Sequence, residues 1–181
     1  MVAVLGICGS VRKKSLNRSL LAAVGAALPE GASLTTFDGL ERLPIFNSDL
    51  EDPALVVELK QAIAAADGVV FAVPEYNYSI PGGLKNALDW VSRPPASSPL
   101  RGKPVALVGA ASGMSGTIRA QTHMRQILLY SDSQCLGQPE VLIARAHERF
   151  ADDGTLIDAS TRELIARFAI AFVAFVERMQ R

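Results

Sequence analysis

Apolar residues occur along the chain in short uninterrupted runs, separated by longer segments in which apolar positions recur every three or four residues. A short run that is apolar throughout indicates a β-strand buried on both faces, and the longer period indicates an amphipathic helix. The runs predict strands at Val2–Ile7, Ser33–Phe37, Val69–Val73, Val105–Gly109 and Val141–Ala144. The periodic segments predict helices at Leu16–Leu28, Pro53–Ala66, Pro81–Val91, Met114–Leu129 and Thr161–Met179.

This alternation of strands and helices predicts the α/β fold class. Strands buried on both faces are typical of a parallel sheet covered by helices, which gives a three-layer, doubly wound domain. We expect one domain over residues 1–181, with a five-stranded parallel sheet in the flavodoxin-like order 2-1-3-4-5. Ligands of such sheets bind beyond the carboxyl ends of the strands, so the loops after the first, third and fourth strands are expected to converge.

The first of these loops, residues 9–17, is rich in hydrogen-bond donors and leads directly into the first helix. The first N–H groups of a helix have no partner within it and lie at the positive end of the helix dipole, so they attract anions. Ser10, Ser15 and Asn17 add polar side chains, and Arg12 adds a cation. So many donors in one short loop predict a terminal phosphate with two negative charges.

The other two loops suit the remainder of a flat ligand. Pro74 and Pro81 fix the backbone on either side of Tyr76, Asn77 and Tyr78, leaving backbone polar groups and an amide to meet the edge of a heterocycle. The tyrosine rings offer apolar faces to a ligand ring or a second subunit. The third loop, residues 109–116, is built almost entirely of small residues, so a flat group can approach its backbone closely.

The two motifs at residues 9–17 and 74–86 resemble those of the NAD(P)H-dependent FMN reductases of the flavodoxin superfamily, nearest to the chromate and quinone reductase branch. The resemblance implies FMN as cofactor and NADPH or NADH as electron donor. It implies small-molecule electron acceptors, such as quinones, chromate and azo or nitro aromatics, and assembly into a homodimer or homotetramer.

The resemblance also implies which residues hold the cofactor. It assigns the FMN phosphate to Ser10, Arg12, Ser15 and Asn17, with Leu16 in the same cofactor-binding loop. It places Pro74, Glu75, Tyr76, Asn77 and Ser112 beside the isoalloxazine.

The chemistry that we expect is a two-step, ping-pong transfer of electrons through the flavin. Because the cofactor carries this chemistry, the protein needs no catalytic acid, base or nucleophile of its own. For Glu75 an alternative is open, in which it is a solvated turn residue that contributes its backbone rather than its carboxylate.

Other functions fit less well. The chain has neither the glycine spacing of a dinucleotide fold nor a G-K-[ST] triphosphate loop. A phosphatase of the low-molecular-weight type has a cysteine, five residues and then Arg-Ser. At that spacing from Cys8 this chain has Lys14, and Lys cannot make the two-pronged contact of Arg to a phosphoryl group. A flavin-binding electron carrier or sensor without turnover is the remaining alternative. The resemblance to the wider flavodoxin group implies an acidic surface for a single-electron carrier, whereas this chain has no net charge.

The composition of the chain bears on its binding partners and on the cellular compartment in which it works. With 18 Lys and Arg against 18 Asp and Glu, we expect no general binding of nucleic acid. Cys8 and Cys135 have neither metal-site nor disulfide spacing, so we expect no metal and a reducing cytoplasm. The longest apolar run, Phe168–Val176, is shorter than the roughly 20 residues needed to cross a bilayer, and no secretory leader is evident, so no membrane association is expected.

Overall fold

The structure of the protein is a computed structural model that describes residues 1–180. Its strands are β1 (Val2–Cys8), β2 (Ala32–Phe37), β3 (Gly68–Ala72), β4 (Pro104–Ala110), β5 (Gln134–Cys135) and β6 (Val141–Ile143). Its α-helices are α1 (Leu16–Ala26), α2 (Ala54–Ala65), α3 (Gly82–Val91), α4 (Ile118–Tyr130) and α5 (Ala159–Met179).

The strands form one parallel sheet in the order β2-β1-β3-β4-β5, which confirms the predicted order. The fifth position is shared by two short strands, since β5 pairs with the start of β4 and β6 with its end. The predicted strand at 141–144 is β6. The sequence did not reveal β5, because two half-buried residues make no apolar run. Pro139, between the two strands, has no N–H to donate to a ladder.

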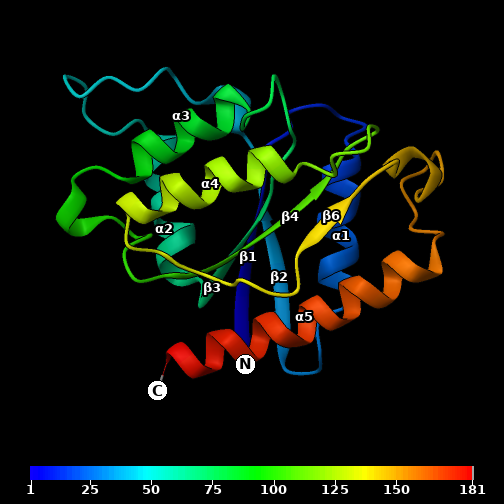
Figure 1. Ribbon diagram of the computed structural model, residues 1–181. Helices are drawn as coiled ribbons and strands as arrows, with labels where there is room; N and C mark the ends of the chain where they lie inside the picture. The colour runs from blue at the N-terminus through cyan, green and yellow to red at the C-terminus, as the bar shows by residue number, and fades with distance from the viewer. Residues whose placement is uncertain (181) are drawn as a thin grey trace.

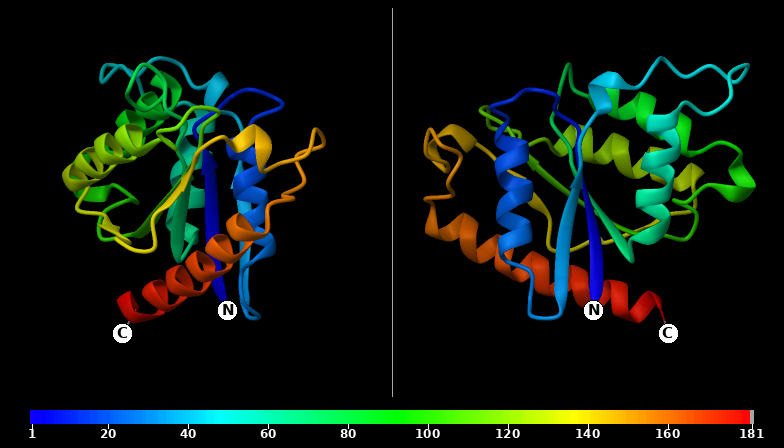
Figure 2. Two further views of the ribbon diagram at one scale, coloured as in Figure 1. Left: turned by 45° about the vertical axis from the view of Figure 1, so that its right-hand side comes forward. Right: turned by 180° about the vertical axis from the view of Figure 1, so that it is seen from behind.

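Helices cover both faces of the sheet, with α1 and α5 on one face and α2, α3 and α4 on the other (Figures 1 and 2). Every residue of β3 is buried, and two successive residues of this strand, Val70 and Phe71, belong to two different apolar clusters. Successive side chains of a strand point to opposite faces, so this alternation places one core on each side of the sheet. The predicted three-layer architecture is therefore confirmed.

The start of α4 differs most from the prediction. The helix begins at Ile118 rather than at Met114, whereas the other predicted boundaries agree within two residues. Gly116 and Thr117 have φ values of 57° and 72°, and this left-handed conformation interrupts a right-handed helix. The Thr117 side chain is fully buried over Gly109 of β4, so tertiary packing fixes this turn.

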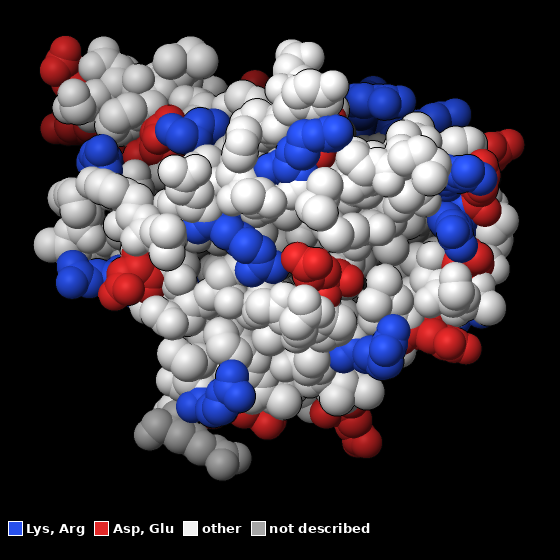
Figure 3. Space-filling view, viewed as in Figure 1, with Lys and Arg blue, Asp and Glu red and all other residues white. Residues whose placement is uncertain are grey.

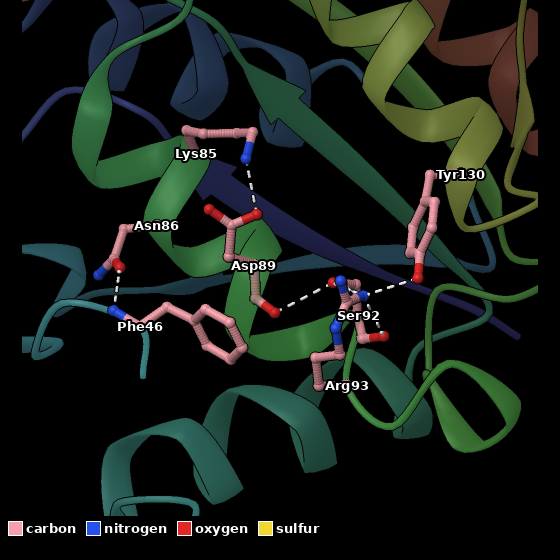
Figure 4. Close-up of polar contacts among 7 residues, drawn as sticks. All are labelled: Phe46, Lys85, Asn86, Asp89, Ser92, Arg93 and Tyr130. Carbon is pink, nitrogen blue, oxygen red and sulfur yellow. Dashed lines mark hydrogen bonds and ion pairs between the residues drawn. The ribbon is translucent and has the colours of Figure 1, made fainter. Parts of the chain in front are cut away.

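Polar contacts join α3 and the residues that follow it to neighbouring segments (Figure 4). The Asn86 side-chain oxygen accepts a hydrogen bond from the Phe46 N–H at 2.8 Å. Just beyond the helix, the Arg93 guanidinium donates to the Tyr130 hydroxyl at the end of α4, also at 2.8 Å. These contacts fix α3, which follows directly after the second of the three predicted site loops.

Candidate functional site

The loops after β1, β3 and β4 meet at the carboxyl-end edge of the sheet, which is the upper edge in Figure 1, and enclose a cleft of about 360 Å³. Nine of the ten predicted cofactor-binding residues line this cleft, and the exception is Asn77. The predicted convergence of the three loops is therefore confirmed. The volume lies in the range of small-molecule sites in proteins, roughly 300–1,000 Å³.

One end of the cleft has the features of an anion site. Ser15 precedes α1 but its hydroxyl makes no capping hydrogen bond. Within the described residues, the N–H groups of Leu16 and Asn17 have no acceptor, because the first backbone bonds of this turn come from the two residues that follow. The side chain of Ser10 is buried in the same wall, and that of Arg12 is exposed beside it.

The side chain of Asn17 has a structural partner. Its amide donates to the Ala110 carbonyl at 2.8 Å and accepts from the Ala110 N–H at 2.9 Å. Both residues are buried, so this pair joins the first turn of α1 to the end of β4. The part of Asn17 left available to a ligand is its backbone N–H. Nothing in the sequence indicates this pairing between residues 93 positions apart.

The second loop contains a tight turn that holds one side of the cleft. Tyr76 and Ser79 exchange two backbone hydrogen bonds of 3.0 Å, and the residues between them, Asn77 and Tyr78, have φ values of 50° and 65°. Two central residues with positive φ are typical of a type I′ turn. Asn77 is exposed at the tip, outside the cleft, while the Tyr76 hydroxyl lies 3.5 Å from the hydroxyl of Ser10.

The carboxylate of Glu75 is bound to the start of α4. It accepts hydrogen bonds from the backbone N–H groups of Arg119 and Ala120 at 3.1 and 3.4 Å and from the Ser115 hydroxyl at 3.3 Å. It also pairs with the Arg119 guanidinium. The side chain is 8 % exposed, so Glu75 is not a solvated turn residue, while its contribution of the backbone to a ligand stays a prediction.

The pKa of Glu75 reflects this environment. Burial by itself raises the pKa of the carboxyl group, but the Arg119 guanidinium and the two backbone N–H groups outweigh it, so the pKa is lowered. Glu75 is therefore an anion at neutral pH and satisfies the first N–H groups of α4. Sequence reasoning did not find Arg119, which is 44 positions away and part of no recognisable motif with Glu75.

The third loop is supported from outside the predicted motifs. The Ala111 N–H donates to the Ile143 carbonyl at 2.9 Å, and the N–H groups of Arg145 and Ala146 donate to carbonyls of Gly113 and Ala111 at 3.0 and 2.9 Å. The end of β6 and the segment after it thus fix the backbone of the third loop. Ser112 remains exposed on the cleft wall.

Comparison with known proteins agrees with this site. Residues 2–148 match the sequence model of the family described as NADPH-dependent FMN reductase. The chain belongs to this family. It is 43 % identical to the NAD(P)H-dependent FMN reductase of Pseudomonas aeruginosa, over 99 % of this chain and 97 % of that protein. It is 35 % identical to the quinone reductase of Escherichia coli K12, over 98 % and 96 %.

A solved structure of similar sequence has the same fold. It is the flavoenzyme NAD(P)H:(acceptor) oxidoreductase FerB from Paracoccus denitrificans, with a TM-score of 0.90 and 34 % identity over 99 % of each chain. The family match ends at residue 148, and the similarity to this structure extends over the rest of the described fold, including α5.

Membership of the FMN reductase family also agrees with the state of Cys8, the last residue of β1. Cys8 is 7 % exposed, and burial raises the pKa of its thiol, the opposite of what a phosphatase nucleophile requires.

Among residues 1–180 no group of three or more His, Cys, Asp or Glu could hold a metal ion. No described helix is long and apolar enough to cross a bilayer. On the face in Figure 3, basic and acidic side chains are interspersed.

Proposed function

We propose that the chain is an FMN-dependent oxidoreductase that passes electrons from NADPH or NADH to quinones and to other small acceptors, including chromate and azo or nitro aromatics. One observation carries the proposal: a single cleft joins an anion-binding helix start to two loops whose walls are backbone and small residues. A flavin mononucleotide has this combination of a terminal phosphate and a flat ring.

At the phosphate end, the ligands would be the hydroxyls of Ser10 and Ser15, the N–H groups of Leu16 and Asn17, and the Arg12 guanidinium. All five residues line the cleft. Hydrogen bonds from charged or dipole-aligned donors to phosphate are stronger than neutral ones, so this end would supply most of the polar binding energy.

At the ring end, the backbone of Pro74, Glu75 and Tyr76 would lie along one edge of the isoalloxazine, with Ser112 opposite. Asn77, at the exposed tip of the turn, would contact the ring from the rim of the cleft. When bound, FMN supplies the acceptance and delivery of hydride. The protein would orient the ring, and backbone N–H groups of the third loop would favour negative charge on it.

We also propose that residues 1–181 form one FMN-binding domain that works in the cytoplasm as a homodimer or homotetramer. Tyr76, Tyr78 and Ile118 support a second subunit, because they are exposed apolar side chains close to the cleft. Light scattering coupled to gel filtration measures the oligomeric state, and a monomer at micromolar concentration would contradict this part of the proposal.

The proposal that the chain is an oxidoreductase is tested with purified protein and added FMN. We expect a yellow protein with flavin absorbance that oxidises NADPH or NADH when a quinone is present. Steady-state turnover without any partner protein separates a reductase from an electron carrier or sensor. A protein that stays colourless after incubation with FMN would refute the proposal.

The phosphate assignment is tested with Arg12→Ala. Loss of a charge-assisted contact predicts FMN binding weaker by about 10- to 100-fold, with little change in the unfolding midpoint of the apoprotein. Arg101→Ala is the control, since Arg101 is also exposed but lies outside the cleft. Equal FMN affinity of wild type and Arg12→Ala would contradict the assignment.

A further inference from the structure

The first two turns of α4 contact the second loop at several points. The Arg119 guanidinium pairs with the Glu75 carboxylate and also lies 4.3 Å from the centre of the Tyr78 ring. One turn further along, the His123 Nδ1 atom is 3.0 Å from the Ser79 hydroxyl. One arginine thus contacts residues on both sides of Asn77, at the tip of the turn.

The exposures of the ion pair show which partner depends on the other. The Glu75 side chain is 8 % exposed and that of Arg119 is 47 % exposed. Little of the Glu75 side chain is open to water, so its carboxylate depends on protein partners, whereas the guanidinium reaches it from the solvent side. Without the Arg119 side chain, a largely buried anion would lose its cation and keep the Ser115 hydroxyl and two backbone N–H groups as partners. The balance would then shift toward conformations of the loop in which the carboxylate turns outward.

The turn itself also needs an external support. Tyr78 adopts a positive φ, which is uncommon for a bulky residue and persists where surrounding contacts impose it. The guanidinium over its ring is such a contact. Arginine suits both tasks, because its planar fork can bond a carboxylate and stack on an aromatic face at once, and lysine cannot do both.

We propose that Arg119 is a positioning residue for the flavin ring, holding the turn between Tyr76 and Ser79 on α4 so that the Pro74–Tyr76 backbone is fixed before a ligand binds. This inference rests on the proposed function. Arg119 does not line the cleft, so it acts through Glu75 and Tyr78. Its removal lowers the fraction of molecules with a competent loop, and apparent affinity falls by that fraction.

The inference makes a distinctive prediction, because the two ends of the ligand can be probed separately. Riboflavin has the ring without the phosphate. Arg119→Ala should therefore weaken FMN and riboflavin binding by the same factor, about tenfold if one molecule in ten keeps the competent loop. Arg12→Ala should weaken FMN binding and leave riboflavin binding unchanged. Arg119→Lys should lie between wild type and Arg119→Ala.

Arg149→Ala is the matched control. Arg149 pairs with Asp158 at 2.8 Å, and the Asp158 carboxylate accepts from the Thr161 N–H at the start of α5. The same chemistry thus joins an arginine to a carboxylate at a helix start, away from the cleft. We expect wild-type affinity for both flavins in this variant. That result would show that the loss of an ion pair at a helix start is not enough by itself to weaken flavin binding.

Both flavins are titrated into each apoprotein by fluorescence quenching, at a temperature well below the unfolding midpoint of the least stable variant. Equal weakening of FMN and riboflavin in Arg119→Ala supports the inference. Wild-type affinity for both flavins in that variant, or weakening of FMN alone, would overturn it and leave the proposed function intact. A wild-type protein that binds neither flavin would refute both, and the Arg12→Ala comparison would show no difference.

Discussion

Replacing Asn17 by alanine separates a structural role from a ligand-binding role at the same position. The Asn17 amide makes two hydrogen bonds to Ala110, and both residues are 5 % exposed. In Asn17→Ala the backbone N–H and C=O of Ala110 lose their partners. The backbone N–H of Asn17, which faces the cleft, is unchanged by the substitution.

The cost can be worked from these two groups. Leaving a buried donor or acceptor unpaired costs about 1–3 kcal/mol each, so both together cost about 2–6 kcal/mol. Both residues border the cleft, so water can replace part of the loss, and we expect about 3 kcal/mol. This is a large part of a typical folding free energy of about 5–15 kcal/mol, but the variant should still fold.

Urea unfolding of the apoprotein measures this cost. With a slope of about 2–3 kcal/mol per molar urea, 3 kcal/mol lowers the midpoint by roughly 1 M. Asn86→Ala is the matched control, because the Asn86 amide also bridges two backbone groups, at Phe46 and Pro44, but is only half-buried. Its midpoint should fall by less than half as much, since water can take over both bonds.

FMN binding provides the second half of the test. The folded Asn17→Ala protein should bind FMN within about threefold of wild type, because the N–H of residue 17 is retained. A midpoint shift below about 0.3 M together with a large loss of FMN affinity would refute this reasoning and return the side chain to the phosphate.

Two further predictions concern stability away from the ligand. Gly109→Ala would place a Cβ 1.8 Å from the Thr117 hydroxyl, so it should destabilise the protein by at least about 1–3 kcal/mol in urea unfolding; an unchanged midpoint would contradict the packing described for α4. Hydrogen bonds from Ser160 and Thr161 lower the pKa of Asp158, so unfolded chains bind more protons at acid pH. The ionised Asp158 stabilises the fold above the pKa of an unfolded Asp, about 3.9, and this stabilisation is lost as pH falls below that value. The unfolding midpoint of Asp158→Ala should therefore fall less than that of wild type between about pH 5 and pH 2. The same pH dependence in both proteins would count against this role.

Much of the fold could be predicted because burial leaves a local record in the sequence. The uninterrupted apolar run at Val69–Val73 predicted a strand with both faces covered, and every residue of β3 is indeed buried. Gln134–Cys135 left no such record, because its two residues are half-buried and polar or small. The start of α4 was also missed, since the left-handed Thr117 is held by packing over Gly109 and not by a local signal.

The sequence by itself determined the alternation of buried strands and helices and the donor-rich helix start, because periodicity and helix chemistry are local properties. The strand order followed from the fold class that this alternation indicates. The tertiary structure decided what the polar side chains do there. Asn17 is bound to Ala110, 93 positions away, and Glu75 to Arg119, 44 positions away. A sequence lists the donors and acceptors of a loop, but the partner of each depends on which distant segment the fold brings beside it.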